Sequence, residues 1–197
     1  MRRWLPITAI LISLAPGTAL AQASIEPDPR PRLPPQPGQG LPEHDQAFLQ
    51  RAAELSAAQI EAGRLATDRA SDDRVRGLAG ELMDAHEEIA TEVEALASDL
   101  GAEMGNSEGS AGAVETLGTL EGLEGTDFDR AYLEWQLRTH VELADLYQTE
   151  ASQSPVTPLA GHAIRIFADI QEHVTAIREL AGEYGIDVDL SEQPPQY

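Results

Sequence analysis

The sequence contains no cysteine and no lysine, and its 13 basic residues, all arginines, stand against 34 acidic residues. Without cysteine the chain can form neither a disulfide nor a thiolate metal site, and it cannot be lipidated on a cysteine. The formal net charge of −21 excludes an ordinary nucleic-acid-binding protein and disfavours anionic membrane surfaces, because both repel an acidic chain. The negative charge instead favours the binding of a cation or a basic partner.

Long apolar runs are also lacking, apart from a short one at the N-terminus. There, Arg2 and Arg3 precede an apolar stretch that ends in small residues at Ala19 and Ala21. This layout predicts that residues 1–21 form a signal peptide, cleaved after Ala21, so we expect a periplasmic or secreted protein. The run is short for a transmembrane helix, so no stable membrane span is expected after cleavage. An uncleaved membrane anchor is the alternative interpretation.

Proline and glycine divide the rest of the chain. Residues 22–42 contain seven prolines, which predicts a disordered, extended linker. Residues 43–186 contain four segments whose apolar residues are spaced three and four apart, as in four amphipathic helices. Residues 187–197, which include two further prolines, are expected to be a disordered tail.

The connection between the second and third helices is long. Residues 101–125 contain seven glycines, whereas the other two connections are short. One long crossover at this position is the connection of ferritin-like folds, and an up-down bundle needs only a short loop there. The sequence therefore predicts an all-α, ferritin-like four-helix bundle.

Polar residues indicate where these helices begin. Side chains that accept hydrogen bonds from free backbone N–H groups are favoured at helix N-termini, and glycine is favoured after the last turn. The expected N-caps are Asp45 for the first helix, Ser71 or Asp72 for the second, and Thr126 or Asp127 for the third. Gly101 is expected to end the second helix.

Each predicted helix places one nitrogen-bearing side chain in its apolar stripe. These side chains are Gln59, His86, His140 and His173. A buried polar group without a partner costs about 1–3 kcal/mol. We therefore expect the four to meet one another, or to meet something bound among them.

A mononuclear metal site is one interpretation of this pattern. Three imidazoles suit zinc or copper, with Gln59 as a weak fourth ligand or with an open position. Asp169, one turn before His173, would orient that ring by a hydrogen bond to its other nitrogen, and Met83, one turn before His86, would offer copper a soft ligand. The alternative is a hydrogen-bond network that fixes helix register without metal. A carboxylate-bridged di-iron centre is not expected, because the Glu-x-x-His motifs of such proteins are missing.

Other chemistry is weakly indicated. The sequence has no glycine-rich phosphate loop, no nucleophile motif and no basic aromatic patch, so no catalytic residue is assigned and a binding protein is favoured over an enzyme. A structural or interaction module of the cell envelope, binding a protein partner through its linker or acidic faces, is the alternative function. His44 is expected to be solvated at the end of the linker, and His162, beside the fourth stripe, is expected to serve in packing or capping.

Four segments resemble the bacterial envelope proteins of domain-of-unknown-function family 4142. They are DQAFLQRAAELSAAQIEAGRLA, VRGLAGELMDAHEEI, GTDFDRAYLEWQLRTHVEL and FADIQEHVTAIREL, and they extend over residues 45–181. The resemblance implies a ferritin-like fold but no established activity. It marks five characteristic positions, which are His86, Asp129, Tyr132, His140 and His173. The chain departs from the family pattern at Gln59, where Glu is usual, and at Ala168, where Pro is usual.

Overall fold

The computed structural model describes residues 40–105 and 117–186. Its four long helices are α1 (Glu43–Arg69), α2 (Asp73–Leu100), α4 (Gly125–Gln153) and α5 (Thr157–Glu183). A short helical segment covers residues 117–121, and the described residues contain no β-strand. The expected signal peptide, the linker up to residue 39 and the tail lie outside the described residues.

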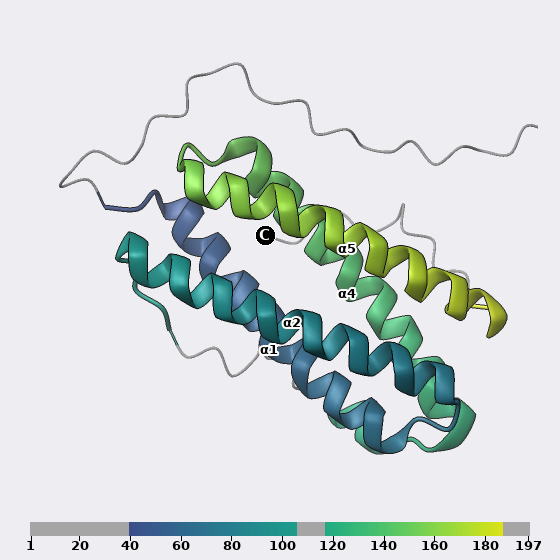
Figure 1. Cartoon of the computed structure of the whole chain (residues 1–197). Coiled ribbons are helices and arrows are strands. Elements are labelled where there is room, and N and C mark those ends of the chain that lie inside the picture. Colours follow the sequence, from purple (N-terminus) through teal and green to yellow (C-terminus); the bar gives the residue numbers. More distant parts are fainter. Residues whose placement is uncertain (1–39, 106–116, 187–197) are drawn as a thin grey trace, which may run out of the picture.

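The helices run side by side in two antiparallel pairs, α1 with α2 and α4 with α5 (Figure 1). The end of α2 lies beside the start of α1, where Gln46 Nε2 donates to the Glu103 carbonyl at 2.6 Å. The start of α4 lies at the opposite end, where Asp129 accepts from Ser71 N at 2.9 Å. The chain must therefore cross from one end of the bundle to the other between α2 and α4. This confirms the predicted fold class, a four-helix bundle with one long crossover.

Two of the expected helix ends are found as predicted. The Asp72 side chain accepts from Arg74 N at 2.8 Å and caps α2. Gly101 ends α2 in the left-handed conformation at φ +66, which a residue without Cβ adopts at little cost.

Two expected N-caps are wrong. α4 begins at Gly125 after Glu124 and has no side-chain cap, so neither Thr126 nor Asp127 serves as one. α1 begins at Glu43, two residues before the expected cap. Asp45 therefore lies inside the first turn, and its side chain is fully buried. Pro42 precedes this turn, and its fixed φ is compatible with starting a helix there.

Small residues bring α1 and α2 close together. A Cβ built at Gly63 would lie 2.6 Å from the Met83 Cβ, so the two backbones approach more closely than any larger residue allows. Met83, considered above as a copper ligand, packs its Cβ and Cγ against this glycine. No helix of the described part is both long and apolar enough to cross a bilayer.

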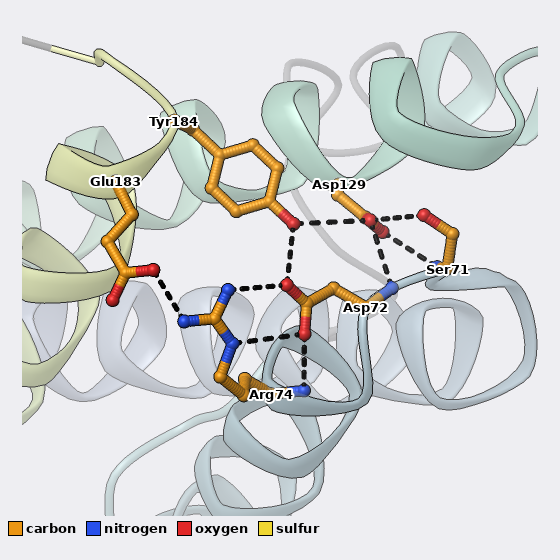
Figure 2. Close-up of polar contacts among 6 residues, drawn as sticks. All are labelled: Ser71, Asp72, Arg74, Asp129, Glu183 and Tyr184. Atoms are coloured by element: carbon orange, nitrogen blue, oxygen red, sulfur yellow. Dashed lines mark hydrogen bonds and ion pairs between the residues drawn. The ribbon is translucent and has the colours of Figure 1, made fainter.

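Polar contacts of Asp129 tie three helices together at one end of the bundle (Figure 2). The buried Asp129 carboxylate accepts from Ser71 N at 2.9 Å, from Asp72 N at 3.1 Å and from the Tyr184 hydroxyl at 3.4 Å. These bonds join the α1–α2 turn to the start of α4 and the end of α5. Asp129, one of the five positions marked by the family resemblance, therefore has a structural role.

Candidate metal centre

Three histidines from three helices converge inside the bundle. His86 of α2, His140 of α4 and His173 of α5, together the histidine cluster, each place one ring nitrogen within 4.8 Å of the other two. The ring centroids lie 5.4, 5.6 and 6.2 Å apart. The first two side chains are fully buried and His173 is half-buried.

The backbone of α4 fixes the orientation of one ring. His140 Nδ1 lies 3.1 Å from the Gln136 carbonyl oxygen. A carbonyl can only accept, so Nδ1 carries the hydrogen and Nε2 carries a lone pair. His140 Nε2 lies 3.5 Å from His86 Nε2, inside the cluster. A metal-binding imidazole is commonly held by this kind of contact on its other nitrogen.

A polar ladder supports this histidine along α4. The Gln136 amide donates to the Tyr132 hydroxyl at 2.7 Å, and the same residue supplies the carbonyl that receives His140 Nδ1. The three residues follow one another at intervals of four, so they lie on one face of the helix. Burial raises the pKa of the Tyr132 hydroxyl, which therefore stays protonated.

Burial keeps the cluster uncharged at neutral pH. It lowers the pKa of His86 well below its usual value, and the neighbouring His140 and His173 lower it further. Burial, with His173 beside it, lowers the pKa of His140 to about 3. Burial also lowers the pKa of His173, although the carboxylates of Asp169, Glu172 and Glu81 oppose it. Neutral imidazole is the form that binds a metal ion.

The spacing of the ring nitrogens suits a transition metal. Two imidazole nitrogens bound to tetrahedral zinc lie about 3.3 Å apart, given Zn–N bonds of about 2.0–2.1 Å. The Nε2 atoms of His86 and His140 are 3.5 Å apart. Closing the third ring onto the same ion needs only small side-chain movements, since all three ligand atoms lie within 4.8 Å.

A groove between α2 and α5 connects the cluster to solvent. It encloses about 230 Å³, and His173 is one of its lining residues. Its walls also carry Glu88 and Glu92 from α2, and Asp169 and Glu172 from α5. Arg165 also lines it and pairs with Glu92, so the lining is acidic overall. Such a lining attracts cations toward the half-exposed ring.

Neither of the two tentative ligand positions makes a hydrogen bond to the histidine cluster within the described residues. Asp169 is exposed in the groove, and no hydrogen bond joins it to His173 within the described part of the chain. Its influence on that ring is through charge. Gln59 is fully buried in α1, and neither atom of its amide has a hydrogen-bond partner among the described residues.

Several polar contacts in the structure differ from the sequence-based expectations. His44, expected to be solvated, is partly exposed but places Nε2 2.8 Å from Glu150 Oε2. His162 is buried as expected, and its Nδ1 lies 3.1 Å from Glu92 Oε2. Glu150 follows Tyr147 by three residues in the apolar stripe of α4, a spacing that could have identified it as a buried acid.

Comparisons with known proteins show a family and a shared fold. A family model described as "Domain of unknown function (DUF4142)" matches residues 30–180. A solved structure titled "Crystal structure of DUF305 fragment from Deinococcus radiodurans" is similar, with a TM-score of 0.65 and 16% sequence identity. The match covers 74% of this chain and 99% of that chain, and at this identity it shows a shared helical fold. No curated protein matches the chain.

Proposed function

The chain belongs to the DUF4142 family of domains of unknown function, and we propose that it is an exported protein that binds Zn²⁺ or Cu²⁺ in its histidine cluster. The family description names no activity, so the proposal rests on the residues themselves. No residue is assigned a catalytic role.

The observation that carries the proposal is the convergence of three neutral imidazoles with few hydrogen bonds among them. Only His86 and His140 approach within hydrogen-bond distance, and at 3.5 Å this contact is at the upper limit. Nδ1 of His173 is buried without a partner in the described structure, and the Nε2 lone pair of His140 has only the long contact with His86. A network built only to fix register would be expected to satisfy its members. A cation between the rings would engage lone pairs that the protein leaves free.

The acidic groove supports the same conclusion. A buried site needs a route for its ion, and His173 belongs to both the cluster and the groove. The groove carboxylates would concentrate cations at its mouth, while the imidazoles inside would select transition metals over Ca²⁺ and Mg²⁺, which prefer oxygen ligands.

Export is the second part of the proposal. Its support is the layout of the first 21 residues, with two arginines, an apolar run and small residues before the expected cleavage position. A metal-free interaction module of the envelope is the competing function, and metal binding distinguishes the two.

The test is a competition titration of Zn²⁺ and Cu²⁺ against a chromogenic chelator, using protein without a histidine tag. Replacing both His86 and His173 by Leu should remove one equivalent of bound metal, because two of the three ligands are lost. Leucine suits a buried stripe position, so this variant should fold, as circular dichroism would check. His162→Leu is the matched control, since it removes another buried α5 histidine and should retain that equivalent. Unchanged stoichiometry and affinity in the double variant would overturn the proposal.

A further inference from the structure

A second cluster of ligand-type side chains lies at the end of the bundle where α1 begins. His44 and Asp45 come from the first turn of α1, and Glu150 comes from the last turns of α4. Each offers one ligand atom, and these atoms lie within 4.8 Å of one another. His140 precedes Glu150 by ten residues on the same helix, which corresponds to about 15 Å along its axis. The two clusters are therefore separate.

Most of the carboxylate oxygens of this cluster lack hydrogen-bond partners in the described structure. Asp45 and Glu150 are both completely buried. Neither oxygen of Asp45 has a hydrogen-bond partner in the described structure, and Glu150 Oε1 has none either. Buried polar groups nearly always have such partners, and two ionised carboxylates this close together repel each other. Within residues 40–105 and 117–186, no arginine pairs with either carboxylate.

Either a proton or a cation can relieve this repulsion. Burial, together with the Asp45 carboxylate beside it, raises the pKa of Glu150 to about 8. One proton shared by the pair would leave His44 with no necessary role. Yet His44 Nε2 lies 2.8 Å from Glu150 Oε2 and completes a set of one nitrogen and two carboxylates.

We propose that His44, Asp45 and Glu150, the carboxylate site, bind a divalent metal ion. One imidazole and two carboxylates form a harder donor set than three imidazoles, so this site would accept Mn²⁺ as well as Zn²⁺. The His44 side chain is 42% exposed and gives the ion access from solvent, whereas the carboxylates lie behind it. The three donors of the carboxylate site lie on two helices and not on a loop, so the helices hold them in place.

This site shares no residue with the histidine cluster, so it can be tested in a background from which the cluster has been removed. The starting protein is the full chain without a histidine tag, carrying Leu at positions 86 and 173. Mn²⁺ is the probe, and its free concentration is followed by electron paramagnetic resonance at physiological salt, which suppresses weak binding to the acidic surface.

The variants are Glu150→Gln and Asp45→Asn, each of which removes one charge with little change in shape. Both should lower Mn²⁺ affinity about tenfold or more, because a ligand is lost. Glu134→Gln is the matched control, since it makes the same change on an ion-paired surface residue of α4 and should leave the affinity unchanged. Circular dichroism checks that every variant is folded.

The background protein should bind one Mn²⁺ saturably, and Zn²⁺ should displace it, because affinity rises from Mn²⁺ to Zn²⁺. Absence of saturable binding would overturn the proposal, as would equal affinities for Glu150→Gln, Asp45→Asn and Glu134→Gln. Either result would leave a shared proton as the explanation for the two buried carboxyl groups. Since the histidine cluster is absent from this background, neither result bears on the function proposed above.

Discussion

Acid should destabilise the metal-free bundle through its buried histidines, and His140 provides the sharpest case. Its side chain is completely buried, and burial beside His173 lowers its pKa to about 3. In the unfolded chain the same imidazole has an ordinary pKa of about 6.5. Below that value the unfolded state binds a proton that the folded state does not. The free energy of unfolding must therefore fall as the pH falls.

The size of the effect follows from these two values. Between pH 7 and pH 5, proton linkage at His140 alone lowers the free energy of unfolding by about 2 kcal/mol. His86 adds a loss of the same sign, because its pKa is also lowered. Glu150 acts in the opposite direction, because its pKa is raised to about 8 and its folded form holds a proton that the unfolded form releases. The wild type and a variant at position 140 both contain His86 and Glu150. The contributions of these two groups therefore largely cancel when the free energies of unfolding of the two proteins are compared.

The assay is urea unfolding of the wild type and of His140→Leu at several pH values, with a chelator present. The stability of the variant relative to wild type should rise by about 2 kcal/mol between pH 7 and pH 5. Gln59→Leu is the control, since it replaces another buried polar side chain that does not titrate, and its relative stability should not change with pH. A pH-independent difference for His140→Leu would refute the reasoning, because it would mean that the folded protein protonates this ring readily.

Two further predictions concern the scaffold, and both are measured as shifts in the urea unfolding midpoint. Gly63→Ala should destabilise the protein by about 1–2 kcal/mol, because the new methyl would lie 2.6 Å from the Met83 Cβ and this overpacking outweighs the better helix propensity of alanine. Gly80→Ala, whose methyl would have no atom within 4 Å, should instead stabilise, and equal effects of the two would contradict the close approach of α1 and α2. Asp129→Asn should cost about 2 kcal/mol, because an amide cannot accept as many bonds from the α1–α2 turn as the carboxylate does. Exposed Asp127→Asn should have little effect, and a similarly small loss at position 129 would show that these bonds do not stabilise the fold.

Most of the fold could be predicted because its causes are local. Apolar spacing of three and four defined the helices, and the glycines of residues 101–125 marked the crossover. The start of α1 could not be predicted in the same way. An acid near a helix start is usually a solvated cap, but here the helix begins two residues earlier and packing against α4 buries Asp45.

The candidate site was partly predictable for the same reason. His86, His140 and His173 interrupt apolar stripes, so their convergence follows from packing those stripes together. The contact that orients His140 uses a backbone carbonyl, which every residue offers, and so leaves no signal in the sequence. Gln59 also interrupts an apolar stripe, but its amide makes no hydrogen bond in the described structure. A position in the stripe predicts that a side chain is buried and does not predict its partners.

The most direct test of the central claim is the metal content of the untagged protein, recovered from its own cells without chelators. We predict about one equivalent of zinc or copper held by the histidine cluster, and its loss when His86 and His173 are both replaced by Leu. Wild-type protein that contains neither metal, and takes up neither on titration, would contradict the claim and leave the three histidines as elements of the core.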